Sequence, residues 1–186
     1  MTVCGIVLAA GAGTRYGQPK ALARDADGVP WVARVVDTLV AAGCAPVFVM
    51  LGAQRAEAAA LVPAAAMIVG VADWADGLSA SVRAGLGAAS TTTATGALVV
   101  PVDVPEVATS ACRRVMARAG SAPDALVQAT YAGAVGHPVL IGRAFWRSLA
   151  EQVRGDRGAG PYLRAHGALA VECGDLWHGR DVDIAS

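Results

Sequence analysis

The fold is decided by one stretch near the N-terminus, Val7-Leu8-Ala9-Ala10-Gly11-Ala12-Gly13-Thr14-Arg15-Tyr16-Gly17-Gln18-Pro19-Lys20. The apolar run over residues 3–9 predicts a buried strand, which leads into a loop with glycines at positions 11, 13 and 17. Glycine lets backbone N–H groups approach an anion closely, because no Cβ stands in the way. Arg15 and Lys20 add two positive charges, so the stretch predicts a phosphate-binding loop. Its Gly-x-Gly-x-x-x-Gly spacing differs from that of the Walker and Rossmann loops.

Composition favours one α/β domain over the whole chain, residues 1–186. Hydrophobic residues make up 55% of the chain and aromatic residues 5%, which suits a parallel sheet covered by alanine-rich helices. The formal net charge is zero, so no surface for nucleic acid or acidic membranes is expected. The N-terminal apolar stretch is too short to cross a bilayer, and we expect a cytoplasmic enzyme. The four cysteines contain no Cys-x-x-Cys pair, which makes a zinc site improbable and favours reduced, buried thiols.

Strand and helix patterns alternate along the chain. Strands are predicted over residues 3–9, 47–51, 67–71, 97–102, 126–131, 138–141 and 169–173, and helices over 30–42, 55–62, 79–89, 106–119, 143–153 and 162–165. Residues 132–137 are expected to form a loop. This alternation predicts a three-layer α/β/α sandwich with a mostly parallel, Rossmann-like sheet. In such folds ligands bind at the carboxyl ends of the strands, where both the glycine loop and Asp103 lie.

The glycine loop resembles the signature of nucleotidyltransferases that make activated sugars, alcohols and cofactors. The matching residues are Leu8-Ala9-Ala10-Gly11-x-Gly13-Thr14-Arg15-x-Gly17-x-Pro19-Lys20. The resemblance implies the fold of the nucleotide-diphospho-sugar transferases. It also implies that the loop wraps the triphosphate, with Arg15 and Lys20 as catalytic cations. The nucleotide-binding residues that it implies here are Ala9, Ala10, Gly11, Gly13, Thr14, Arg15 and Lys20.

Asp103 ends an apolar strand, and two interpretations of it remain open. It could cap the next helix, or it could bind magnesium, because Mg²⁺ favours one or two carboxylates beside phosphate oxygens. The related enzymes carry Gly-Asp-Met-Pro or a close variant here, which implies a metal ligand with a catalytic role. A second ligand is implied in Asp181-Val182-Asp183, with Asp183 preferred to Asp181. The family's threonine and proline are missing after it, so this segment could instead be a frayed acidic tail.

The run Trp74-Ala75-Asp76-Gly77-Leu78-Ser79-Ala80-Ser81-Val82-Arg83-Ala84-Gly85-Leu86 is similar to one found in molybdenum cofactor cytidylyltransferases. That resemblance implies that Gly77, Ser79 and Ser81 contact the base and ribose. The alternative is that the serines only cap the helix, with Ser79 as its first residue. Leu-Ala-Ala-Gly in the glycine loop also resembles the cytidylyl branch more than the guanylyl branch. CTP is therefore the expected nucleotide.

Two further segments match the same branch. Gly136-His137-Pro138-Val139-Leu140 and Gly155-Asp156-Arg157-Gly158 resemble its Gly-His-Pro and Gly-Asp-Lys/Arg-Gly motifs. They imply that His137 and Arg157 contact the acceptor, with Arg157 binding a phosphate as a planar fork. His137 could otherwise be a simple turn residue.

Together these motifs predict a molybdenum cofactor cytidylyltransferase-like enzyme. The expected reaction transfers CMP from CTP to the phosphate of a molybdopterin-type cofactor and releases pyrophosphate, with Mg²⁺ held by Asp103 and Asp183. A molybdoenzyme is a conceivable protein partner. Three alternatives stay open: guanylyl or other nucleotidyl transfer on the same scaffold, reduction of nicotine blue with NAD(P)H as in some actinobacterial relatives, and non-catalytic nucleotide or cofactor binding.

Overall fold

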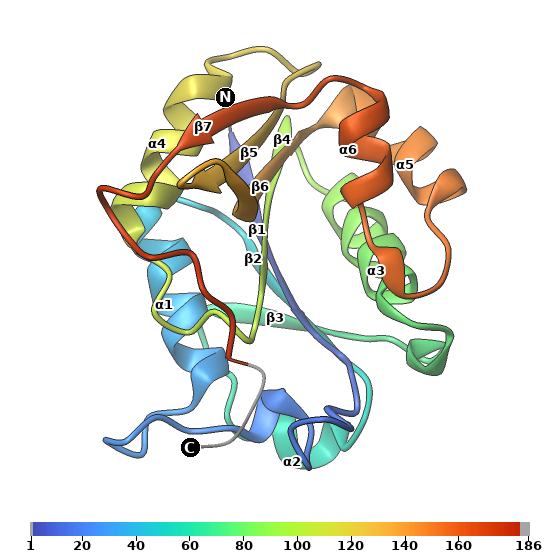
Figure 1. Ribbon diagram of the computed structural model, residues 1–186. Helices are drawn as coiled ribbons and strands as arrows, with labels where there is room; N and C mark the ends of the chain where they lie inside the picture. Colours follow the sequence, from blue (N-terminus) through green and yellow to red (C-terminus); the bar gives the residue numbers. More distant parts are fainter. Residues whose placement is uncertain (1, 183–186) are drawn as a thin grey trace.

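The computed structural model describes residues 2–182, which are organised around a seven-stranded sheet (Figure 1). Its strands, in sheet order, are β3 (Ala66–Gly70), β2 (Val47–Leu51), β1 (Val3–Ala9), β4 (Gly96–Pro101), β6 (Ala134–Gly142), β5 (Leu126–Tyr131) and β7 (Leu169–Glu172). Of these strands only β6 runs against the others, pairing antiparallel with β4 and β5. The prediction of a mostly parallel sheet is confirmed.

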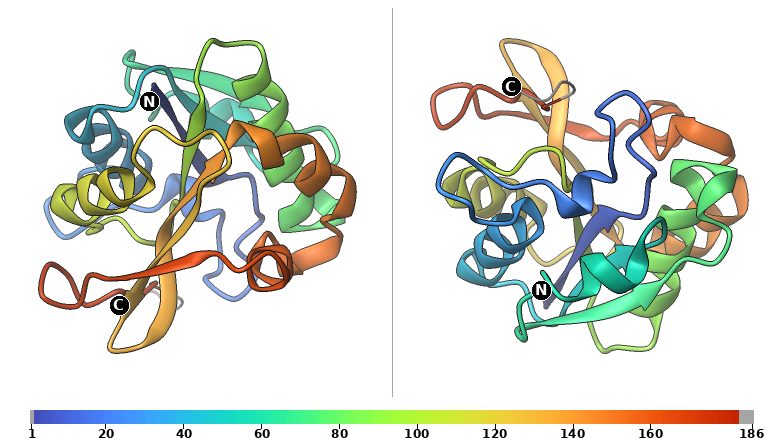
Figure 2. Two further views of the ribbon diagram at one scale, coloured as in Figure 1. Left: turned by 90° about the horizontal axis from the view of Figure 1, so that it is seen from above. Right: turned by 90° about the horizontal axis from the view of Figure 1, so that it is seen from below.

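Helices cover both faces of this sheet (Figures 1 and 2). One face packs against α1 (Trp31–Ala42) and α4 (Thr109–Ala119), and the other against α3 (Leu78–Ser90), α5 (Trp146–Gln152) and α6 (Gly160–Ala165). Alternate residues of β1 enter the two cores: Val7 joins the α1–α4 core, and Ile6 and Leu8 join the α3–α5–α6 core. The α/β sandwich is therefore built by the period-two alternation of apolar strands.

The remaining elements are short. They comprise α2 (Arg55–Ala59) and the 3-10 turns η1 (Lys20–Leu22), η2 (Trp74–Asp76), η3 (Arg143–Phe145) and η4 (Gly155–Arg157). In residues 2–182 no helix has the length and apolar character needed to cross a bilayer. All four cysteines are buried and unpaired in this part of the chain, as expected. Burial raises the pKa of the Cys4 thiol to about 11 and that of the Cys44 thiol to about 12.

Some strands and helices begin or end at other residues than the sequence predicts, because tertiary contacts determine these boundaries. Residues 134–137 belong to β6 rather than to a loop, because Ala132 (φ 51°) and Gly133 (φ 81°) form a tight two-residue hairpin turn. Helix α2 ends at Ala59 rather than at residue 62. Helix α4 starts at Thr109 rather than at residue 106, with Ala108 at its N-cap position. Asp103 therefore does not cap that helix, and this alternative is wrong.

Ser79 is not a helix cap. Helix α3 starts at Leu78, and Gly77 occupies the N-cap position with no side-chain cap hydrogen bond. Ser79 lies buried inside the first turn, where its hydroxyl oxygen accepts a hydrogen bond from Arg83 Nη1 at 3.2 Å. Arg83 Nη2 also donates to Asp73 Oδ2 at 3.0 Å. This pair of contacts fastens the loop before α3 to the helix.

Candidate functional site

A cavity of about 870 Å³ opens at the edge where the parallel strands end and antiparallel β6 begins. Its size is typical of sites for nucleotide-sized ligands, which are on the order of 300–1,000 Å³. Twelve of the residues predicted for the site line it: Ala9, Ala10, Gly11, Gly13, Thr14, Arg15, Lys20, Gly77, Ser81, Asp103, His137 and Asp181. The structure thus brings together residues from five separate motifs.

The glycine loop between β1 and η1 forms one wall of the cavity. Gly13 has φ 62°, and a Cβ there would collide with the carbonyl oxygen of Gln18, so the turn requires glycine. The Gly17 N–H donates to the Gly13 carbonyl at 2.9 Å and closes the loop. Tyr16 packs against Trp31 of α1, with ring centroids 5.3 Å apart. The loop is therefore held in shape while Thr14 and Arg15 remain exposed at the cavity.

Lys20 and Asp103 form an ion pair across the cavity. Lys20 begins η1, Asp103 follows β4, and Lys20 Nζ lies 3.1 Å from Asp103 Oδ2. The two side chains are only 14% and 25% exposed, which strengthens their attraction relative to a surface pair. The neighbouring Ala21 and Ala23 are buried and fix the backbone beside the lysine. Each charged group could exchange its partner for a ligand: phosphate for Lys20, a cation for Asp103.

Asp181 reaches the same cavity from the C-terminal segment. The Val182 N–H donates to the Asp103 carbonyl at 2.9 Å, which joins the segment to the end of β4. Two carboxylates on hydrogen-bonded segments suit a hard divalent cation that is also bound by phosphates. In residues 2–182 no group of three or more acidic, histidine or cysteine side chains is placed to hold a metal alone. Asp183, the preferred second ligand, lies outside the described residues.

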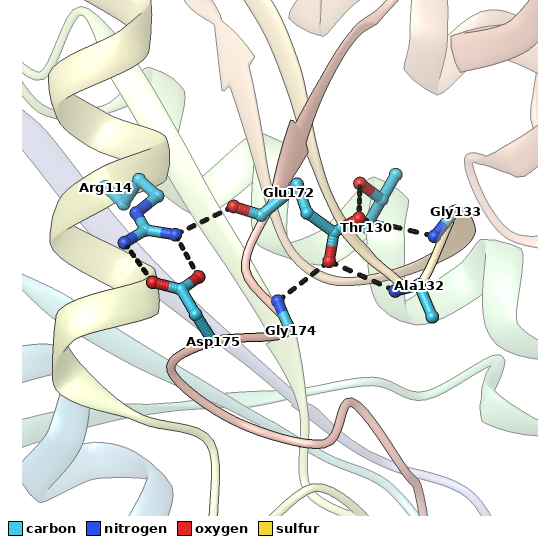
Figure 3. A network of polar contacts seen from close by, with 7 residues as sticks. All are labelled: Arg114, Thr130, Ala132, Gly133, Glu172, Gly174 and Asp175. Carbon is cyan, nitrogen blue, oxygen red and sulfur yellow. Dashed lines mark hydrogen bonds and ion pairs between the residues drawn. The ribbon is translucent and has the colours of Figure 1, made fainter.

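The C-terminal segment is fastened by a polar network at the end of β7 (Figure 3). The Glu172 carboxylate accepts hydrogen bonds from the backbone N–H groups of Ala132, Gly133 and Gly174 and from the Thr130 hydroxyl. These bonds, chiefly that from Gly174, lower the pKa of Glu172. Arg114 of α4 bonds the Glu172 carbonyl and both Asp175 oxygens, as Figure 3 shows. The network therefore fixes the turn from which the chain returns toward Asp103.

Tyr131 connects this segment with His137. Its ring packs edge-on against Trp177, with centroids 5.3 Å apart, and its hydroxyl donates to the His137 carbonyl at 2.6 Å. The Nδ1 atom of His137 is buried and has no hydrogen-bond partner among the described residues. Burial lowers the pKa of His137, against the opposing charges of Asp103 and Asp181. Burial of His137 therefore favours its neutral imidazole form, beside both carboxylates.

Two predicted site residues do not line the cavity, and several lining residues were not predicted. Ser79 turns toward Arg83, and Arg157 is exposed outside the cavity wall, whereas its neighbour Asp156 lines it. The unpredicted lining residues include Tyr16, Trp74, Gln128 and Asp156. Trp74 and Asp156 lie within segments that the sequence singled out, so the motifs located the right loops. Which side chain of each loop faces the cavity depends on tertiary packing.

The sequence and the fold of this chain resemble those of known proteins. The model of the MobA-like NTP transferase domain matches residues 5–170. Nicotine blue oxidoreductase of Paenarthrobacter nicotinovorans is 34% identical, over 97% of this chain and 92% of that protein. The crystal structure of a Mycobacterium tuberculosis Rv0371c homologue from Mycobacterium sp. strain JC1 covers 98% of this chain and 90% of its own, with 25% identity and a TM-score of 0.80. A manganese complex of Rv0371c from Mycobacterium tuberculosis H37Rv has 24% identity and a TM-score of 0.71, covering 93% of this chain and 88% of its own.

Proposed function

Because the chain belongs to the family of MobA-like NTP transferase domains, we propose that it transfers CMP from CTP to the phosphate of a molybdopterin-type cofactor. The observation that carries the proposal is the glycine loop with Arg15, Lys20 and Asp103 around one cavity. The choice of CTP and of a pterin acceptor rests on the sequence motifs described above. Binding of the acceptor beside a partner molybdoenzyme would be consistent with this role.

The reaction forms a bond between an acceptor phosphate oxygen and the α-phosphorus of CTP. The bond from that phosphorus to the bridging oxygen breaks, and its electron pair leaves with pyrophosphate. Because the acceptor phosphate is already ionised, no strong general base is required. The work of the chain is to align the two phosphates and to offset their charge. Arg15, Lys20 and the loop N–H groups hold the leaving pyrophosphate.

Asp103 and Asp181 are the described residues that would hold Mg²⁺, with Asp183 as a third candidate outside the described chain. When bound, the ion offsets negative charge that develops on the phosphate oxygens. The manganese complex of Rv0371c supports use of a divalent cation in this fold. For Asp103 to bind the cation through Oδ2, Lys20 must leave that oxygen and turn to phosphate.

His137 and Gln128 belong to the part of the cavity beside β4, β5 and β6. An uncharged imidazole can donate a hydrogen bond to the acceptor, and unlike an imidazolium it does not bring a positive charge to the Asp103 carboxylate. Arg157 is a weaker candidate for an acceptor contact, because it does not line the cavity. We therefore assign the acceptor to the His137 side of the glycine loop.

Calorimetric titration with CTP, GTP, ATP, UTP and NADPH, each with and without Mg²⁺, tests the proposal. We expect CTP to bind most tightly and magnesium to strengthen its binding. A preference for GTP would keep nucleotidyl transfer but replace the base. Binding of NADPH without CTP would instead favour the second candidate, an oxidoreductase like the Paenarthrobacter relative that is 34% identical.

A further inference from the structure

The cavity has two ends, separated by the glycine loop after β1. The sheet order places β2 and β3 on one side of β1 and β4, β6 and β5 on the other. Asp103 and His137 therefore lie at one end, on the β4–β6 side. Trp74 follows β3 and lies at the other end, where Gly77 and Asp156 also line the cavity. We call this second end the Trp74–Asp156 end.

Asp156 is positioned by close packing of its loop against the start of α3. A Cβ on Gly77 would collide with Asp156 Oδ1, so the carboxylate lies directly against the Gly77 backbone. A Cβ on Gly158 would press on Leu78 Cδ2 at 2.8 Å. Two glycines thus allow the Gly155–Arg157 turn to approach the helix. Among residues 2–182, no hydrogen bond or ion pair engages the Asp156 carboxylate, and it lines the cavity.

Trp74 supplies a flat surface at the same end. Its Cβ and Cγ occupy the space that a Cβ on Gly52 would need, 2.5 and 2.6 Å away. The side chain is partly buried, packs against the α3–α5–α6 core and lines the cavity. An aromatic face that is held in this way can stack on a nucleobase of any kind.

Charge decides which part of a nucleotide can lie here. An unneutralised carboxylate repels phosphates, which are attracted instead to Arg15 and Lys20. The nucleoside is uncharged, and an amino-bearing base offers N–H donors that a carboxylate accepts well. We infer that Asp156 is the residue that selects the base at this end: it accepts a hydrogen bond from the exocyclic amino group of a base that stacks on Trp74. This inference rests on the proposed function and names a residue that selects cytosine over uracil, whose O4 would face the carboxylate as a second acceptor.

The test compares CTP and UTP binding to the wild type and to Asp156→Asn by calorimetry. An asparagine amide can donate to O4 of uracil, so we expect the ratio of CTP to UTP affinity to fall about 10- to 100-fold. Asp76→Asn is the matched control, since Asp76 is an exposed neighbour on η2 that does not line the cavity. Trp74→Leu should weaken CTP and UTP by similar factors, because stacking is tolerant of the base.

An unchanged CTP to UTP ratio in Asp156→Asn, with CTP still bound, would overturn the inference and leave the proposed function intact. A wild type that binds 2′-deoxy-CTP much more weakly than CTP, with that difference lost in Asp156→Asn, would assign the carboxylate to the ribose and also overturn it. Failure of the wild type to bind any triphosphate would overturn the proposed function itself.

Discussion

Lys20 and Asp103 form an ion pair, yet the proposed reaction needs both side chains for other ligands. Their 3.1 Å ion pair places a cation beside the carboxylate that would hold Mg²⁺. A metal that binds before the nucleotide must displace Lys20, whereas a nucleotide draws Lys20 toward its phosphates. Metal and nucleotide are thus expected to bind cooperatively, with each raising the affinity of the other by the same factor.

Replacing Lys20 by methionine should remove this competition. We expect Lys20→Met to bind Mn²⁺ about tenfold more tightly than the wild type in the absence of nucleotide, because a neighbouring positive charge is lost. Titration of Mn²⁺ followed by electron paramagnetic resonance measures this directly. Arg147→Met is the control, since Arg147 is exposed and pairs with Glu151 on α5. Equal Mn²⁺ affinity in Lys20→Met and wild type would contradict the account of the ion pair.

At the scale of elements, the junction between η2 and α3 depends on Gly77. Its φ of 97° and ψ of −171° are accessible almost only to glycine, and a side chain would also strike Asp156. We expect Gly77→Ala to lower the free energy of unfolding by about 1–3 kcal/mol and to weaken nucleotide binding. Urea denaturation gives the first quantity.

Gly87 offers a matched control for that substitution. It lies exposed within α3, and a Cβ there would meet nothing within 4 Å. Gly87→Ala should therefore stabilise the helix by about 0.5–1 kcal/mol, because alanine loses less backbone entropy. If both variants were equally stable, the steric explanation for Gly77 would be wrong.

The hairpin between β5 and β6 is tied to the end of β7 by Glu172, and this tie should depend on pH. Hydrogen bonds, chiefly from the Gly174 N–H, hold the pKa of Glu172 below the ordinary 4.5. The folded protein therefore favours the ionised form, and its stabilisation is present above pH 4.5 and lost as the pH falls through the folded pKa. Glu172→Gln should lower the urea midpoint at pH 7, with a smaller difference from wild type in acid.

Glu151→Gln controls for the loss of a surface carboxylate, because Glu151 is exposed and pairs only with Arg147 among the described residues. A pH-independent difference between Glu172→Gln and the wild type would mean that ionisation of Glu172 does not contribute. If the polar network around Glu172 positions Asp181, the affinity for Mn²⁺ should also fall in Glu172→Gln.

For the whole molecule, the runs of apolar residues predicted the strands, because both faces of a buried parallel strand must be apolar. The alternation of these strands with helices predicted the sandwich. The glycine loop could be predicted because its shape depends on the backbone conformation of a few consecutive residues. The structure departs from the sequence prediction where distant segments meet. Ser79 is drawn into a contact with Arg83, and the turn at Gly155 presents Asp156 rather than Arg157 to the cavity. Asp181 reaches the cavity only because the chain after β7 returns to Asp103.

We propose that nucleotidyl transfer takes place in the cavity between the glycine loop and Asp103. Its most direct test is release of pyrophosphate from CTP and Mg²⁺ in the presence of the phosphorylated pterin cofactor, compared between the wild type and Asp103→Ala. We expect the wild type to release pyrophosphate and form the cytidylyl dinucleotide. Asp103→Ala should remain folded by circular dichroism and lose more than about 100-fold of this rate. Full magnesium-dependent activity in a folded Asp103→Ala variant would contradict the account.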